Sequence, residues 1–107
     1  MANTYKNAKV DLTSTGVTTL YTTPAKATSI VKSILVSEDS NNADTITVTI
    51  TDSTAAVFSI FKEKSIGAKA TTELLSAPLV LNTGDILKVT AATANRLHVI
   101  ASILEIS

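Results

Sequence analysis

The chain has 107 residues, of which 45% are apolar, and this length allows one domain with one core. Nine basic and nine acidic residues give a net charge of zero, which excludes nucleic acid and anionic membrane as primary partners because both require a clustered positive surface. Without cysteine, stability must come from a good core or from association with other chains, and the first twelve residues lack the apolar segment of a secretory signal.

The first third of the chain begins with a polar stretch, and strand-like segments follow it. Residues 1–7 are predicted to form a flexible N-terminal arm, and residues 8–107 a single domain. Residues 9–12 and 17–22 are expected to be short strands. Residues 29–37 (SIVKSILVS) predict a strong strand with apolar residues on both faces, although Lys32 occupies a position where an apolar residue would be expected.

Residues 45–52 (TITVTITD) show the clearest alternation in the chain and predict a half-buried strand with a wet threonine face. This strand is expected to form a hairpin with the preceding one, joined by the polar loop EDSNNAD. Further strands are predicted at residues 56–62, 69–75, 79–81, 86–91 and 97–106, although residues 69–75 also fit a helical turn. The alternating charges of residues 62–64 are expected at a solvated strand edge, where they discourage edge pairing.

About eight short strands, spaced roughly ten residues apart with turn residues between them, favour a β-sandwich over βαβ units. The predicted fold class is therefore all-β, a single antiparallel β-sandwich. A jelly-roll and an immunoglobulin-like topology both remain open at this point.

The chain carries no recognisable catalytic or cofactor motif. His98 is the only histidine, lies within a predicted strand, and has no Gly-x-Ser-x-Gly element to supply a nucleophile, so a structural or interface role is expected. One histidine and no cysteine do not make a zinc site, and three well-separated glycines do not make a phosphate cradle. No enzyme activity and no cofactor are therefore expected.

The EDSNNAD loop is the only candidate for calcium, because its oxygen-bearing side chains could act as ligands. It lacks the glycine and the terminal glutamate of an EF-hand loop, and a solvated hairpin loop is favoured. The potential ligands are Glu38, Asp39, Asn41 and Asp44. Sugar binding is disfavoured because the chain has no tryptophan and few aromatic residues, and Phe58 and Phe61 are expected in the core.

Three predicted strands (29–37, 56–62 and 97–106) have apolar residues on both faces, which exceeds what one small core absorbs. Either β-bulges or barrel closure turn some of these residues inward, or neighbouring subunits cover them, and the second explanation is favoured. In the last strand Leu97, Val99 and Ile103 are expected in the core. The predicted subunit-interface residues are Ile100, Leu104, Ile106, Val31 and Leu35.

Three segments also carry a family resemblance: LYTTP at residues 20–24, PLVLNTGDILKVTA at residues 78–91, and VIASILEI at residues 99–106. In this order they resemble small virion structural proteins of tailed bacteriophages, over roughly residue 17 to the end.

The resemblance implies a non-enzymatic protein located in the virion and assembled in the host cytoplasm. The favoured role is a capsid decoration (cement) protein that forms a homo-oligomer, with a trimer favoured, and stabilises the capsid shell. The major capsid protein or another virion protein would be its partner. A tail, neck or fibre-anchoring component is the alternative, and a glycan- or receptor-binding module is a more distant one.

Overall fold

The alternating sequence folds into nine β-strands in a computed structural model that describes residues 2–107. The strands are β1 (Asn3–Asp11), β2 (Thr18–Thr22), β3 (Thr28–Glu38), β4 (Asp44–Thr51), β5 (Val57–Ile66), β6 (Thr71–Glu73), β7 (Leu79–Leu81), β8 (Ile86–Ala91) and β9 (Leu97–Ile106). Residues 2–107 contain no helix, and so no helix long and apolar enough to cross a membrane.

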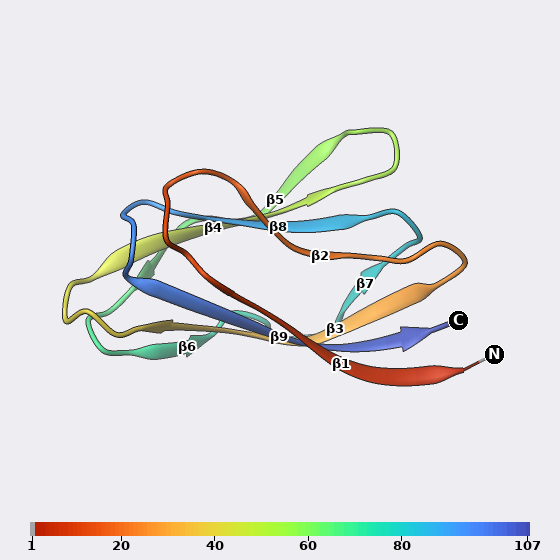
Figure 1. The fold of residues 1–107 in the computed structure, drawn as a ribbon, viewed down its shortest axis with the longest axis horizontal. Coiled ribbons are helices and arrows are strands. Elements are labelled where there is room, and N and C mark those ends of the chain that lie inside the picture. Colours follow the sequence, from red (N-terminus) through yellow and green to blue (C-terminus); the bar gives the residue numbers. More distant parts are fainter. Residues whose placement is uncertain (1) are drawn as a thin grey trace.

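The strands form two antiparallel sheets that pack face to face (Figure 1). The five-stranded sheet has the order β1-β9-β3-β6, with β7 also paired to β3, and the four-stranded sheet has the order β2-β8-β4-β5. The predicted all-β antiparallel sandwich is confirmed. The strands pair in a nested order, β1 with β9, β2 with β8, β3 with β6 and β4 with β5, so the chain resembles one long hairpin rolled into two layers. This order is that of a jelly roll, which decides between the two topologies left open by the sequence.

The core lies between the sheets and is built from alternate residues of the long strands. In β9 the inward residues Leu97, Val99 and Ile103 are fully buried, as their period of two predicts. In β4, Ile46 and Val48 are also fully buried. Each such side chain contributes roughly 1.5–3 kcal/mol when it is fully buried, so alternation on one face is enough to orient a strand.

A β-bulge in β3 changes which side chains face the core. The pairing of β3 with β9 shifts between Val31 and Ser33, and Lys32, the extra residue, is exposed. Val31 and Ile34 consequently both point inward although three positions separate them, and each has 0% exposure. The prediction of Val31 as an interface residue is therefore wrong, because its side chain is enclosed by the core of its own subunit.

The N-terminal strand begins earlier than the sequence indicated. Residues 3–7, which were expected to form an arm, belong to β1 and pair with β9 in continuous register from Asn3 opposite Ile106. Ala2 and Ser107 exchange two further backbone hydrogen bonds of 2.8 and 2.9 Å, so the two chain ends lie side by side (Figure 1). The side chains of residues 3–7 are exposed, which explains their arm-like composition. The part of the predicted arm at Met1 lies outside the described residues.

The predicted hairpin between β3 and β4 is wrong, because these strands belong to different sheets. The EDSNNAD segment carries the chain from one layer to the other, and β4 pairs instead with β5 and β8. A half-buried alternating strand has the same sequence pattern in either arrangement, so alternation could not distinguish them.

Glu38 organises this crossover loop from the inside. Its side chain is only 2% exposed, and its carboxylate accepts hydrogen bonds from the backbone N–H groups of Ser40 at 2.8 Å, Lys69 at 3.0 Å and Asn42 at 3.2 Å. The Ser40 hydroxyl donates another. Burial alone would raise the pKa of Glu38, but these hydrogen bonds outweigh it and lower the pKa to about 2.

This pKa predicts an acid-sensitive loop. Because the pKa falls on folding from an ordinary 4.5 to about 2, the ionised carboxylate stabilises the fold fully above pH 4.5. That stabilisation is lost as the pH falls from 4.5 towards 2. In thermal melts followed by circular dichroism, the wild type should lose more of its melting temperature over this range than Glu38→Gln, which has no charge to neutralise. Parallel pH profiles of the two proteins would contradict the assigned role.

Candidate interaction surface

The outward face of the five-stranded sheet, called here the outer face, carries apolar side chains in register across several strands. Residues directly opposite each other in antiparallel strands point to the same side of a sheet. The register places Tyr5 opposite Leu104, Leu104 opposite Ile30, and Ile30 opposite Val80. This set, called the Tyr5 row, crosses β1, β9, β3 and β7. Tyr5 is 75% and Val80 55% exposed, and the two central residues are half-buried.

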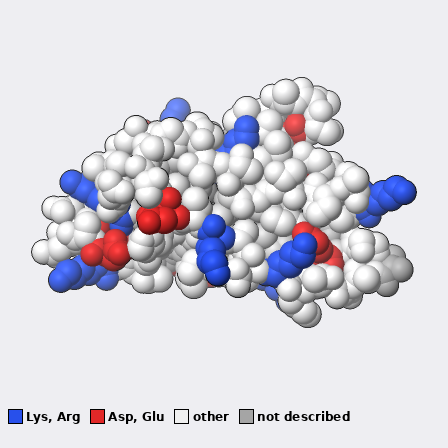
Figure 2. Space-filling model, in the orientation of Figure 1, with Lys and Arg blue, Asp and Glu red and all other residues white. Residues whose placement is uncertain are grey.

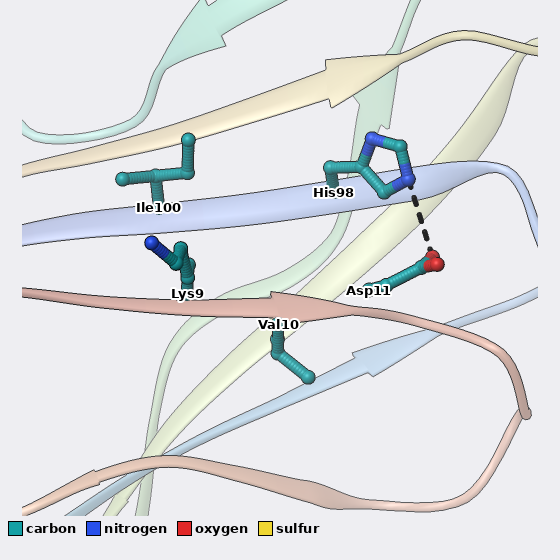
Figure 3. A pocket seen from close by; sticks show the side chains of 5 residues that line it. All are labelled: Lys9, Val10, Asp11, His98 and Ile100. Atoms are coloured by element: carbon teal, nitrogen blue, oxygen red, sulfur yellow. Dashed lines mark ion pairs between the residues drawn. The ribbon is translucent and has the colours of Figure 1, made fainter.

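A second row lies further along the same strands and combines apolar and charged side chains. Lys9 is opposite Ile100, Ile100 is opposite Leu35, and Leu35 is opposite Glu73. This set is called the Lys9 row. Ile100 is 43% and Leu35 38% exposed, so two apolar side chains lie at its centre with a cation at one end and an anion at the other. Figure 3 shows Lys9 and Ile100 on neighbouring strands, with Val10 pointing to the opposite side of β1.

Small polar side chains separate the two rows. Asn7, Ser102 and Ser33 occupy this intermediate position across β1, β9 and β3. The bulge residue Lys32 places its Nζ 5.8 Å from the centre of the Tyr5 ring, within the range of a cation–π contact. Lys32 and Tyr5 line a shallow hollow of about 380 Å³ at this end of the face.

Glu73 has a fixed place at the end of its row because it fills a gap in the sheet. β7 pairs with the first part of β3 and β6 with the last part, which leaves the β3 backbone between them without a strand partner on this edge. The Glu73 carboxylate accepts hydrogen bonds there from Ile34 N at 2.8 Å and from the Ser33 hydroxyl, and a third from Leu75 N at 3.2 Å. Burial opposes ionisation, but these bonds prevail and lower the pKa of Glu73, so the anion is maintained.

A polar cluster between the sheets supports the end of the outer face that carries Tyr5. The Tyr21 hydroxyl, from the opposite sheet, bonds to the Glu105 carboxylate and lies 2.7 Å from Ser29 Oγ, while Lys6 Nζ lies 3.0 Å from Glu105. Burial and then the hydrogen bond to Glu105 raise the pKa of Tyr21 to about 12. The Tyr21 hydroxyl, with Lys6, lowers the pKa of Glu105 against the effect of its burial. The one feature of the sequence that points to this cluster is Glu105, a glutamate at an inward position of β9.

His98 lies at the rim of the outer face, between two carboxylates. Its Nε2 is 3.2 Å from Asp11 and its Nδ1 is 3.6 Å from Asp39, and it borders a shallow hollow of about 300 Å³ with Ile100 (Figure 3). A histidine bonded to a carboxylate in a hollow is part of what a hydrolase needs. A general base must also have a ring nitrogen directed at a nucleophile, and here both nitrogens face carboxylates. The geometry therefore shows a histidine held between two carboxylates at the edge of the sheet.

The side chains that were considered as potential calcium ligands do not converge. Glu38 is directed at backbone N–H groups, Asp39 at His98, and Asp44 accepts a hydrogen bond of 3.1 Å from Thr93 N. Within residues 2–107, no group of three or more His, Cys, Asp or Glu side chains is arranged to hold a metal ion. The loop also differs from the expected solvated hairpin, because Glu38 and Asp44 are buried.

The structure brings four of the five predicted interface residues to one face. Ile100, Leu104 and Ile106 point outward from β9, and Leu35 does so from β3. Only Val31 is elsewhere. Sequence reasoning missed the outer members of the Tyr5 row because Tyr5 was assigned to an arm and Val80 belongs to a strand of three residues.

Two further exposed apolar residues lie on the other sheet. Val57 and Phe58 are at the start of β5, in the hairpin that projects from the body in Figure 1. The prediction that Phe58 belongs to the core is wrong, since it is 58% exposed. The charged residues 62–64 are exposed on the same strand, and two register shifts between β4 and β5 mark bulges there. These charged residues therefore lie at a solvated strand edge, as predicted, and charges and bulges at such an edge disfavour further strand pairing.

No family model matches the chain, and no curated protein shows a significant match to it. Among solved structures, a chain from the structure of the Gt strain of infectious bursal disease virus is similar, with a TM-score of 0.47 and 9% identity. The match covers 98% of this chain and 30% of that chain, so the protein spans under a third of the length of the structure it matches.

Proposed function

We propose that the protein is a non-enzymatic structural component of a virion, and that it assembles through the outer face of its five-stranded sheet. The observation that carries this proposal is the alignment of the Tyr5 and Lys9 rows on one face. An exposed face with large apolar side chains in register across four strands is typical of an interaction surface. Obligate interfaces resemble a protein core cut in half. Strands with apolar residues on their outward side as well as their inward side provide a surface of this kind.

Other function classes have less support from the molecule. The jelly roll is shared by capsid and lectin domains, so the fold alone does not select a function. A sugar-binding site of the aromatic type needs neighbouring exposed rings, whereas Tyr5 and Phe58 lie on different sheets. On the face seen in Figure 2, basic and acidic side chains are interspersed, and a nucleic-acid site would need a gathered positive field.

The specific role rests on the sequence resemblance to small virion proteins of tailed bacteriophages. We favour a capsid decoration protein that forms a homo-oligomer and stabilises the capsid shell by contact with the major capsid protein. A zero net charge suits a protein that packs closely against others, because like-charge repulsion between copies is absent. A tail, neck or fibre-anchoring subunit is the alternative within the same class.

Labelling of purified virions tests this function. Purified particles of the phage that encodes the protein would be incubated with a gold-labelled antibody against the protein and viewed by electron microscopy. We expect the label on heads, evenly distributed. Label confined to tails or necks would replace decoration with the alternative role, and its absence from particles that still label for the major capsid protein would overturn a virion role.

A further inference from the structure

The outer face is complementary to itself, and we infer that it binds the same face of a second copy of this chain about a two-fold axis. The strongest sign is the Lys9 row, which has a cation on β1, two apolar residues at its centre, and an anion on β6. When such a row faces a second copy of itself in the opposite direction, each charge lies opposite the opposite charge and the apolar residues lie opposite each other. This inference deepens the homo-oligomer part of the proposed function.

The geometry of the pairing follows from the strand order. Consider an axis that lies between two facing sheets, runs along the strands, and passes midway between β9 and β3. Rotation about this axis places β1 of one copy over β6 and β7 of the other, and β9 over β3. Aligned sheets pack with their strands within about 30° of each other, so this arrangement is an ordinary one for facing sheets.

Under this rotation the Lys9 row pairs favourably with its partner. Lys9 faces Glu73 of the second copy at both ends, and Ile100 faces Leu35 twice. Lys9 forms no ion pair within residues 2–107, so its charge is available. Glu73 already accepts three hydrogen bonds, but a carboxylate has about four acceptor sites and can also accept an ammonium group.

The other rows are equally compatible with their reversed copies. Tyr5 faces Val80, which pairs an aromatic with a β-branched side chain. Leu104 faces Ile30, which pairs two aliphatic side chains. In the row between them, Ser102 faces Ser33. Lys32 lies beside Tyr5, so it approaches the partner at the end of the face that carries Val80.

The size of the face is sufficient for a stable pair. Nine residues in each of β1, β9 and β3, and three each in β6 and β7, at spacings of about 4.8 Å between strands and 3.3 Å along them, give a face of roughly 520 Å². Two such faces bury roughly 1,000 Å², which is the approximate area expected of a biological interface. A face that binds itself closes at two copies, whereas the trimer favoured by the resemblance requires two different patches on each subunit.

Complementary charges placed at the paired positions test this arrangement with purified protein. Leu35→Glu and Ile100→Lys should each weaken self-association at least 100-fold (about two orders of magnitude), because each buries two unpaired charges per dimer. When the two variants are mixed, a heterodimer can form. One of its two Ile100–Leu35 contacts is replaced by the introduced glutamate facing the introduced lysine, and the other contact is unchanged. Sedimentation velocity should show two monomers before mixing and a 1:1 heterodimer after mixing. Val57→Lys, an exposed apolar site on the other sheet, is the control and should leave the wild-type dimer unchanged.

Both substituted residues are exposed at 38% and 43%, so the variants are expected to fold, and circular dichroism checks this. A wild type that remains monomeric at millimolar concentration, or that forms a trimer, would overturn the inference. So would two folded variants that do not associate with each other on mixing. Because no virion enters this experiment, its failure is distinct from failure of the proposed function: a monomeric protein that decorates particles through this face would mean that a different virion protein covers it.

Discussion

Val31→Asp is expected to unfold the protein, whereas Leu35→Asp, on the same strand, is expected to leave it folded. Val31 points into the core with 0% exposure, and a carboxylate there would have no partner and no water. Such substitutions cost more than about 4 kcal/mol, which approaches the whole free energy of unfolding of a domain at the lower end of the usual range of roughly 5–15 kcal/mol. Leu35 is 38% exposed on the outer face, where Asp costs about 1 kcal/mol, mainly through reduced strand propensity.

Urea denaturation followed by circular dichroism measures both effects. The matched comparison is informative because both residues are aliphatic, lie on β3, and were predicted to contact another subunit. Val31→Ala serves as the milder control and should remain folded with a lowered urea midpoint. A folded Val31→Asp protein with a near-native midpoint would mean that β3 is not bulged at Lys32 and that its faces are reversed.

The bulge explains why β3 could be located from the sequence but its faces could not. In β9 a strict period of two runs from Leu97 to Ile103, and the predicted core and outer sides are both correct as orientations. In β3 the same rule fails at one point, because an inserted residue changes the parity of every later position. Lys32 was the visible sign, since a lysine within an apolar strand fits a bulge that directs it to solvent. Bulges therefore account for part of the apolar excess, and the outer face accounts for the rest.

The remaining differences come from interactions that leave little trace in side-chain patterns. Residues 3–7 are held in β1 by backbone hydrogen bonds to β9, and their exposed side chains indicate nothing about that pairing. The crossover after β3 depends on Glu38, whose acidic side chain appears solvent-seeking in a sequence but satisfies buried N–H groups here. Complete rows on the outer face emerge only when the register of four strands is known. For this reason Ile100, Leu104 and Leu35 could be predicted as interface residues from the sequence. Their neighbours Tyr5 and Val80 could not.

The largest functional effect is expected from replacing Ile100 and Leu104 together with Asp, which should yield a folded, soluble protein that no longer binds virions. Both residues point outward from β9, and each belongs to a different row, so one double variant places a charge in both apolar rows. Loss of two central apolar contacts costs at least about 2 kcal/mol each at an interface of this kind. Together they correspond to roughly 1,000-fold weaker association.

Co-sedimentation with particles depleted of the endogenous protein measures this loss, and the chain offers a matched control. Val57→Asp with Phe58→Asp also replaces two exposed apolar residues of one strand, but on the four-stranded sheet. If the outer face of the five-stranded sheet is the assembly surface, the control protein sediments with particles as the wild type does, while the β9 variant remains in the supernatant. The reverse result would transfer the interaction to the projecting β4–β5 hairpin. Because a self-paired outer face also predicts that the β9 variant is a monomer, sedimentation velocity on the same sample connects loss of particle binding to loss of the subunit contact.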